Sequence, residues 1–340
     1  MQEENIVRVI VSKIQFAWLL ALILTAPAVA QDTALVRINT FPNATNLALF
    51  IGIANGVFEK RGIRIELEFT QNSEAQRDGL ANGKFDIAYS AVDNAVAMVE
   101  LAQHDVIIVT GGDTSMMEFM VRPDIKALVD LRGKTLVVDR PNTAYALQAK
   151  KILKNAGLLE DRDYAVKSVG FTPDRISAIE KGADNAAAGM LNPPFSFAAK
   201  DRGLKSFGRA VDLIGPYQGG GFFVMRGWAY ANGPLLERFI AAYIEATRMA
   251  LAPANRAQAI SLIAARLKQD PEVAERTYDE ALMQPRFGLV PDAKFDLEGF
   301  RSVLALRAEI EGQWGGTPPA PDRYIDLGYY DRAMKRVESR

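Results

Sequence analysis

From residue 35 onward, the spacing of hydrophobic residues changes repeatedly between a two-residue period and a period of three to four residues. Residues 35–40 (LVRINT), 63–70 (IRIELEFT) and 85–91 (FDIAYSA) have the alternation or the short apolar run that is typical of strands. Residues 41–62 and 73–83 have apolar positions at helical spacing, and each segment ends in a glycine. The pattern therefore predicts the order β-α-β-α-β.

The same order of elements recurs in the following part of the chain. Strands are predicted at residues 135–139, 164–170 and 186–191, and they alternate with helices at 143–157 and 173–182. Both parts consequently have the order of elements that is typical of a parallel sheet with crossover helices.

The two parts repeat at a nearly constant offset. Gly83 and Gly182 end the second helix of each part, and Asp86 and Asn185 begin the third strand, an offset of 99 residues in both pairs. Two βαβαβ lobes explain this repeat. A single doubly wound sheet is the alternative, but the polar, proline-containing residues 122–134 separate the halves where a crossing between lobes is expected.

Amphipathic helices follow the second repeat, and we expect them to return to the first lobe. The predicted domains are a first lobe of residues 31–121, a second lobe of residues 122–220, and residues 221–340 returning to the first lobe with the C-terminal helices. The chain is predicted to cross between lobes near residues 120–123 and again near residues 217–222.

The first thirty residues have the pattern of a signal peptide. Arg8 and Lys13 precede an apolar run at residues 16–24, and Ala28 and Ala30 form a small-x-small ending. The run is shorter than the ~20 apolar residues that a membrane-spanning helix needs, which disfavours a membrane anchor. We therefore predict cleavage after Ala30 and export to the periplasm.

Charge and composition exclude several classes of function. Forty basic against 41 acidic side chains give a net charge of −1, and no run of like charge provides a surface for nucleic acid. The chain has no cysteine and one histidine, His104, so thiolate chemistry and cysteine- or multi-histidine-ligated metals are excluded. No cofactor and no metal are expected.

Nothing in the sequence favours catalysis. A Ser-His-Asp triad would depend on His104, which lies at the end of a predicted helix and beside Asp105. The three glycines at 219–221 lack the strand and helix context and the trailing Lys-Ser/Thr of a phosphate-binding loop, and we interpret them as a flexible connection. The protein is predicted not to be an enzyme.

Ligand binding is better supported, because ligands of open α/β sheets lie beyond the carboxyl ends of the strands, next to helix N-termini. Each residue at such a position is also a common helix cap or turn residue, but together they converge on one edge of each lobe. We expect Phe41 to stack on the ligand and the N–H groups of Thr143 and Ala144 to donate to it. The predicted ligand-binding residues are Phe41, Asn43, Thr45, Ser73, Ser90, Asn142, Thr143, Tyr145 and Asn192.

Four segments of the chain resemble those of a known family. They are NLALFIGIANGVFEKRGIRIEL, LANGKFDIAYSAVD, DLRGKTLVVD and MLNPPFSFAAKDRG, and in this order they resemble the solute-binding proteins of the nitrate/sulfonate/thiamine-precursor group of ABC importers. The resemblance spans roughly residues 35–332. It implies a type II periplasmic-binding-protein fold, in which two βαβαβ lobes joined by two crossover segments close on a ligand.

The resemblance also implies a partner, an inner-membrane ABC permease. By position, Asn43, Ser90, Asn142, Thr143 and Asn192 look similar to the strand-end binding loops of that family. The biosynthetic members of the family use a histidine and clustered cysteines, which this chain lacks, so pyrimidine synthesis is disfavoured.

Two functional hypotheses follow. The first is a monomeric periplasmic receptor for a small organic solute, either a sulfonate, an aromatic or heterocyclic acid, or a pyrimidine. The second is an enzyme, because lyases and deaminases of cofactor biosynthesis share this fold. The predicted signal peptide favours the receptor, because those enzymes are cytosolic.

Overall fold

The computed structural model describes residues 33–170 and 172–339. The predicted signal peptide at residues 1–30 lies outside the described residues. Among the described residues, no helix has both the length and the apolar character needed to cross a membrane.

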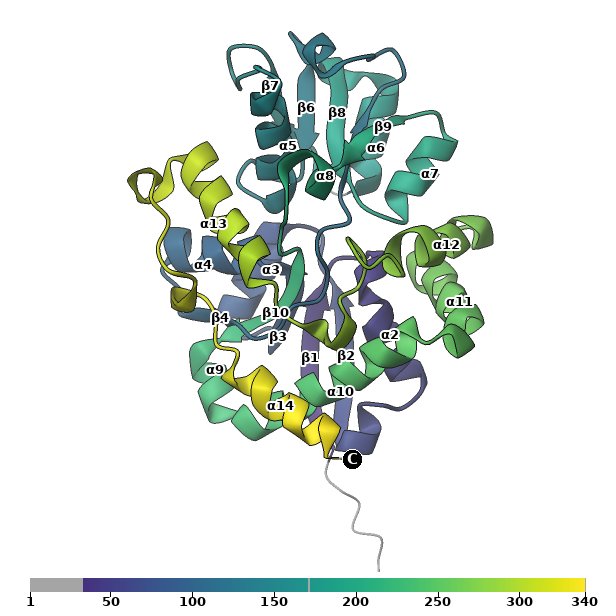
Figure 1. The fold of residues 1–340 in the computed structure, drawn as a ribbon, viewed down its shortest axis with the longest axis vertical. Helices are drawn as coiled ribbons and strands as arrows, with labels where there is room; N and C mark the ends of the chain where they lie inside the picture. Colours follow the sequence, from purple (N-terminus) through teal and green to yellow (C-terminus); the bar gives the residue numbers. More distant parts are fainter. Residues whose placement is uncertain (1–32, 171, 340) are drawn as a thin grey trace, which may run out of the picture. The chain divides into compact units, whose positions relative to one another are not determined.

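Two separate five-stranded sheets organise the chain (Figure 1). In the first sheet, β1 pairs in parallel with β2 and β3, and β10 runs antiparallel between β3 and β4. Its order along the sheet is β2 (Ile63–Phe69), β1 (Ala34–Thr40), β3 (Ile87–Ala91), β10 (Gly220–Met225) and β4 (Val106–Ile108).

The second sheet repeats this topology. β6 pairs in parallel with β7 and β8, and β5 runs antiparallel between β8 and β9. Its order is β7 (Ala165–Ser168), β6 (Thr135–Val138), β8 (Ala186–Leu191), β5 (Glu118–Val121) and β9 (Lys205–Arg209). The predicted fold class, two α/β lobes joined by two crossover segments, is confirmed.

The first crossing lies at different residues from those predicted, while the return crossing overlaps the predicted residues 217–222. Met120 belongs to β5 and pairs with Gly189 of the second sheet, so the chain leaves the first sheet after Ile108 and has crossed by Glu118. The polar residues 122–134 that suggested a crossing are a connection inside the second lobe. The return crossing occupies residues 210–219, because Gly220 already pairs with β3.

We therefore propose lobe limits that follow the strands rather than the composition. The first lobe would contain residues 34–108 and 220–339, and the second lobe residues 118–209. The limits predicted from the sequence, at residues 121 and 220, differ from these because a short antiparallel strand carries no helix or turn signal of its own.

Helices cover the sheets and supply the C-terminal part of the first lobe. The long helix α10 begins with Pro234 at its first turn and packs on α2 and α14. The helices are α2 (Leu47–Ala54), α3 (Ser73–Ala81), α4 (Asp93–Ala102), α5 (Ala144–Asn155), α6 (Thr172–Lys181), α7 (Phe195–Asp201), α8 (Ala210–Ile214), α9 (Arg226–Ala231), α10 (Gly233–Leu251), α11 (Arg256–Leu267), α12 (Pro271–Thr277), α13 (Leu297–Glu311) and α14 (Gly328–Glu338).

A buried aromatic cluster forms the core of the first lobe. The ring of Phe222 lies 4.8 Å from Tyr89, 5.0 Å from Phe239 and 4.6 Å from Tyr243, measured between centroids. All four side chains are buried, and each such burial stabilises the fold by about 1.5–3 kcal/mol. Tyr89 extends from this core to the candidate site described below.

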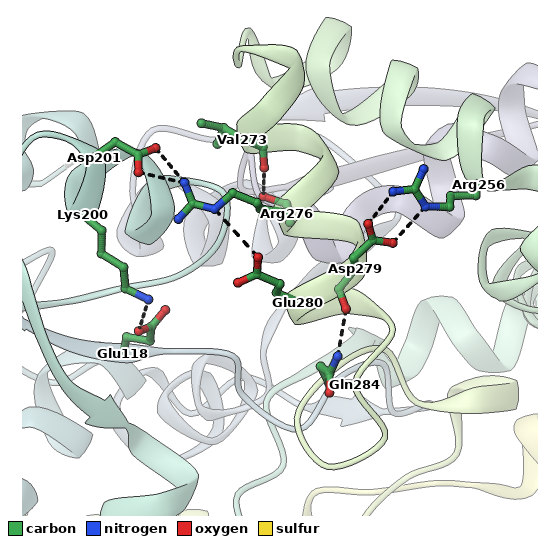
Figure 2. A network of polar contacts seen from close by, with 10 residues as sticks. Glu118, Lys200, Asp201, Arg256, Val273, Arg276, Asp279, Glu280 and Gln284 are labelled. Atoms are coloured by element: carbon green, nitrogen blue, oxygen red, sulfur yellow. Dashed lines mark hydrogen bonds and ion pairs between the residues drawn. The ribbon is translucent and has the colours of Figure 1, made fainter.

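Two C-terminal helices of the first lobe contact the second lobe. α13 packs on α5, and Glu309 accepts hydrogen bonds from Lys151 at 2.7 Å and pairs with Lys154 at 3.1 Å. α12 faces α7, where Arg276 donates to Asp201 at 2.8 and 3.0 Å (Figure 2). Ion pairs therefore join the lobes at two separate places.

Candidate ligand-binding cleft

A cavity of about 50 Å³, which we call the inner cavity, lies between the two lobes. Strand ends of both sheets and both crossing segments contribute to its wall. Its lining residues are Phe41, Asn43, Thr45, Ser73, Tyr89, Ser90, Ala91, Asn94, Asp113, Ser115, Met116, Met117, Asp139, Thr143, Ala144, Tyr145, Asn192, Gly219 and Gly220.

Two further hollows adjoin the inner cavity. A side cavity of about 20 Å³ shares Phe41, Asn43, Asp139, Tyr145 and Asn192 with it and adds Pro42, Gln71, Gly170, Thr172 and Arg175. The larger outer groove, of about 820 Å³, shares Pro42, Gln71 and Gly170 with the side cavity and extends to the C-terminal end of α11 at Arg266. The three hollows therefore adjoin one another from the interior to the surface.

Asn43 shapes the first-lobe side of the inner cavity. It follows Pro42 after β1 and caps the short 3-10 helix Ala44–Asn46, since its Oδ1 accepts from the backbone N–H of Thr45 at 3.0 Å and from the Thr45 hydroxyl. The N–H of Ala44 then donates to the carbonyl of Pro193, in the second lobe, at 3.4 Å. This turn thus forms part of the contact between lobes.

A carboxylate, Asp113, lies where the two crossing segments meet. Its Oδ1 accepts from the N–H of Ser115 at 2.9 Å, and its Oδ2 accepts from the N–H of Gly220 at 2.9 Å and from the Tyr89 hydroxyl at 3.3 Å. Burial raises the pKa of Asp113 above its usual value, while these three donors oppose that shift. Ser115 adopts φ of 69°, an uncommon conformation for a residue other than glycine.

The run of glycines has a packing role, which corrects its interpretation as a flexible connection. A Cβ on Gly219 or Gly220 would lie 2.3 Å from an oxygen of Asp113, and one on Gly221 would lie 2.5 Å from the carbonyl of Thr110. The backbone therefore approaches its neighbours too closely for any side chain. Gly219 and Gly220 also line the inner cavity.

Asp139 connects the lobes on the second-lobe side. Its Oδ2 accepts from the Ser73 hydroxyl of α3 at 3.0 Å, and its Oδ1 accepts from the Thr143 hydroxyl at 2.6 Å. Thr143 is the N-cap residue of α5, but its side chain makes no capping bond. The first N–H groups of α5 therefore begin beside the inner cavity, at Ala144 and Tyr145.

The side cavity contains the buried Arg175, only 3% exposed. Its guanidinium lies 5.0 Å from the ring centroid of Tyr145 and donates to the Thr172 hydroxyl at 3.0 Å and to the carbonyl of Gly170. Burial raises the pKa of Tyr145 above its usual value, so its hydroxyl stays neutral at physiological pH.

Most of the predicted ligand-binding residues come together. Phe41, Asn43, Thr45, Ser73, Ser90, Thr143, Tyr145 and Asn192 all line the inner cavity, while Asn142 does not. The carbonyl of Asn142, the residue before the N-cap of α5, instead accepts from Arg307 of α13 at 3.3 Å. The role of these residues in binding stays a prediction.

Sequence analysis missed several polar residues around the cavities. Asp113 lies in a crossing segment whose location was mispredicted, and Arg175 lies in the first turn of α6 rather than in a strand-end loop. Asp139 ends a predicted strand and could have been included by the same criterion as Asn142. Among the described residues, no group of three or more acidic or histidine side chains is placed to hold a metal ion.

Comparisons with known proteins agree with this architecture. The sequence profile of the family described as NMT1/THI5 like matches residues 43–257. The chain belongs to this family. No curated protein matches the chain by sequence.

Solved structures of low sequence identity share the fold. The periplasmic nitrate-binding protein NrtA of Synechocystis PCC 6803 is similar, with a TM-score of 0.75 and 12% identity over 91% of this chain and 90% of that one. The alkanesulfonate-binding protein SsuA of Xanthomonas axonopodis pv. citri, bound to MOPS, has a TM-score of 0.67 and 19% identity over 84% and 95%. The resemblance to nitrate- and sulfonate-binding proteins is thereby confirmed.

Similar folds belong to proteins of more than one function. The ligand-binding component of an ABC-type import system from Staphylococcus aureus, with zinc bound, has a TM-score of 0.72 and 13% identity over 88% of this chain and 99% of that one. The desulfurization enzyme DszB has a TM-score of 0.60 and 14% identity over 89% and 99%. The chain thus has the periplasmic-binding-protein fold of ABC import solute-binding proteins, a fold that an enzyme shares.

Proposed function

We propose that this protein is the solute-binding component of an ABC importer and binds a small organic solute between its lobes for delivery to an inner-membrane permease. The observation that carries the proposal is the inner cavity, which is lined by strand-end residues of both lobes and by both crossing segments. A ligand in this position would contact both lobes and both segments that connect them.

The proposal includes location in the periplasm and a monomeric state. The NMT1/THI5-like family and the similarity to periplasmic nitrate- and sulfonate-binding proteins support export, together with the signal-peptide pattern of residues 1–30. Exported protein would begin at Gln31, which N-terminal sequencing of an osmotic-shock fraction would test. Recovery in the cytosol with residues 1–30 intact would contradict this part of the proposal.

A screen of solutes by thermal shift tests the binding function. Sulfonates, small carboxylates, aromatic and heterocyclic acids and pyrimidines are the classes to compare. A true ligand at ~100 times its dissociation constant stabilises the folded protein by about 2.7 kcal/mol, which raises the unfolding midpoint measurably. No shift with any class would contradict the proposal.

Two asparagines provide a matched pair of variants. The Asn192 side chain lines both the inner and the side cavity and makes no hydrogen bond to another described residue, whereas Asn142 lines neither. Asn192→Ala should weaken binding about tenfold or more, as expected for the loss of a hydrogen bond worth ~1.4 kcal/mol, while Asn142→Ala should not. Titration calorimetry with the solute from the screen measures both, and equal affinities would remove Asn192 from the site.

An enzyme remains the second candidate, because DszB has a similar fold. The residues lining the two cavities include no histidine, and the chain has no cysteine. Mass spectrometry of the bound solute after long incubation separates the two functions. A receptor returns the solute unchanged, and a new product would favour the enzyme.

A further inference from the structure

We infer that the solute is a small acid that also carries N–H donors, held with its N–H groups in the inner cavity and its negative charge beside Arg175. This inference rests on the proposed function and specifies the ligand class of the same site. It separates this chain from a receptor for a simple oxyanion, because the inner cavity presents acceptors where such an ion would need donors.

A chain of hydrogen bonds fixes the orientation of Asn94 at the inner cavity. The Nε2 of the buried Gln76 donates to the backbone carbonyl of Asn39 at 3.1 Å, so its Oε1 is the atom that accepts from the Ser90 hydroxyl at 2.6 Å. The Ser90 oxygen, having given its only hydrogen, accepts from the Nδ2 of Asn94 at 3.2 Å. Because the Nδ2 of Asn94 is thereby assigned as the donor to Ser90, its Oδ1 is the amide atom that remains without a partner in the described part of the chain.

The free Oδ1 of Asn94 requires a donor. Asn94 is 4% exposed and lines the inner cavity, and its Oδ1 has no hydrogen-bond partner among the described residues. Buried polar atoms in proteins nearly always have a partner. A ligand N–H or O–H group would supply it, and a carboxylate, sulfonate or nitrate oxygen would not.

The charges around the inner cavity also favour a ligand that carries hydrogen-bond donors. Asp113 and Asp139 both line it, and no lysine, arginine or histidine does so within the described part of the chain. Three of the four carboxylate oxygens accept one hydrogen bond from the protein and have a further lone pair for a ligand donor, whereas Oδ2 of Asp113 accepts two. An oxyanion here would face two acidic groups with no basic side chain opposite them.

The side cavity adds a basic side chain, Arg175, to the acidic Asp139 that it shares with the inner cavity. Other buried arginines have acidic partners, as Arg307 has in Asp93 at 2.6 Å and Arg61 has in Glu245 at 2.6 Å. Arg175 is equally buried, but none of the described carboxylates lies within 4.0 Å of its guanidinium, and its Nε has no hydrogen-bond partner among the described residues.

A buried guanidinium without a counter-charge is unfavourable unless a ligand supplies one. Tyr145, whose ring lies under Arg175, is also in the first turn of α5, where N–H groups at the helix N-terminus favour an anion. Because Tyr145 and Asn192 line both cavities, one small molecule can reach from the acceptors of the inner cavity to Arg175. The site therefore offers hydrogen-bond acceptors at one end and a basic side chain at the other.

Matched pairs of probes test the two ends independently. The aminated acids are 4-aminobutyrate and 2-aminopyrimidine-5-carboxylate, and their partners without N–H donors are butyrate and pyrimidine-5-carboxylate. Aminopyrimidine lacks the acid, and nitrate and methanesulfonate are the simple oxyanions. Titration calorimetry should find at least one aminated acid that binds tenfold or more tightly than its partner lacking either group and than both oxyanions.

Two variants assign the ends to residues. Arg175→Gln should weaken binding of the aminated acid tenfold or more and leave the affinity for aminopyrimidine within about twofold of the parent's. Arg175→Lys should keep part of the affinity for the aminated acid. Asn94→Leu should abolish the preference for the aminated acid over its partner. Arg266→Gln is the control, because Arg266 is exposed and lines only the outer groove, and it should change each affinity less than twofold.

The possible results separate this inference from the proposed function. Tighter binding of nitrate or methanesulfonate, or equal binding of acids with and without N–H groups, overturns the inference and leaves the receptor function standing. Binding of no aminated acid also overturns the inference, and the broader solute screen then decides the proposed function. Unfolding midpoints of each variant, measured by circular dichroism, identify a loss of affinity that comes from misfolding.

Discussion

Asp113 holds the backbone of the first crossing segment to that of β10, where the return crossing ends, beside the inner cavity. Its two oxygens accept from the N–H groups of Ser115 and Gly220, at 2.9 Å each, so a single buried side chain fixes both segments. Such a contact needs the backbone to come within hydrogen-bond distance of the carboxylate. Only glycine permits this at position 220, where an added Cβ would lie 2.3 Å from Asp113 and 2.8 Å from the Tyr89 hydroxyl.

Gly220→Ala should therefore destabilise the protein. The extra methyl group forces Asp113 and Tyr89 to move inside a packed region, and overpacking of this kind costs about 1–3 kcal/mol. Urea unfolding measures the change in the free energy of unfolding. Solute affinity should fall as well, because Gly220 lines the inner cavity.

Gly227→Ala is the matched control for that substitution. Gly227 lies in α9, has an ordinary helical φ, and has nothing within 4 Å of an added Cβ. Alanine is favoured over glycine in a helix by about 0.5–1 kcal/mol, so this variant should be as stable as the parent or more so. Equal effects of the two substitutions would show that the close approach at Gly220 is unimportant.

At the scale of single residues, part of the candidate site could be predicted from the sequence. Residues such as Asn43 and Thr143 were found because a strand end followed by a helix start is visible in the hydrophobic pattern. Asp113 and Arg175 were not found, because their surroundings come from segments distant in sequence, such as Gly220 for Asp113 and Tyr145 for Arg175. Burial without a counter-charge has no signature in a single sequence.

At the scale of elements, strands with a helix beside them were predictable and isolated strands were not. The parallel strands of both sheets alternate with helices, so the change of period marks their ends. β5 is four residues long, lies between β8 and β9, and pairs antiparallel with both. Its sequence, EFMV, shows only a short apolar run, so its place in the second sheet depends on partners that the pattern does not reveal.

The C-terminal helix α14 is attached to α10 by a shared acidic residue. Glu237 accepts from Arg332 at 2.6 Å and from Arg336 at 2.8 Å. Burial opposes the ionisation of Glu237, but the hydrogen bonds from the two arginines outweigh it and lower the pKa of the carboxyl below its usual 4.5. The charged form of Glu237 is therefore stabilised by folding.

Glu237→Gln should destabilise the protein in a pH-dependent manner. Because the folded-state pKa is depressed, the stabilisation is fully present above pH ~4.5 and is lost as the pH falls through the folded-state value. Both arginines are about half exposed, so we expect a difference of only about 0.5–1.5 kcal/mol at pH 7. Urea unfolding at several pH values measures it, and a difference that stays constant down to pH 3 would contradict the role of the charge.

At the scale of the whole molecule, several polar contacts join the lobes, in addition to a buried hydrophobic cluster that has members in both. Ser73 donates to Asp139 at 3.0 Å and Arg140 to Glu74 at 2.7 Å near the cavity. Farther from the cavity, Glu309 of α13 forms ion pairs with lysines of α5, and Arg276 of α12 forms an ion pair with Asp201 of α7 (Figure 2).

The outer ion pairs should favour the closed arrangement in the absence of solute. Exposed pairs contribute about 0.2–1 kcal/mol each, so removing both with Glu309→Gln and Arg276→Gln should lower the ratio of closed to open molecules roughly two- to thirtyfold. Solute affinity should fall by at most the same factor, because binding requires the closed state and the apparent affinity scales with the closed fraction. Small-angle scattering and titration calorimetry measure the two effects.

Arg256→Gln is the control for the double variant, since Arg256 pairs within the C-terminal helices and not across the lobes. Figure 2 shows its pair with Asp279, and it also pairs with Glu275. It should leave the radius of gyration unchanged, whereas the double variant should be larger than the parent without solute and equally compact at saturation. High salt should reproduce the effect of the double variant on the parent protein, because ~1 M salt reduces the screening length to about 3 Å. Identical radii of parent and double variant at low salt, with equal affinities, would show that the ion pairs of α12 and α13 do not hold the lobes together.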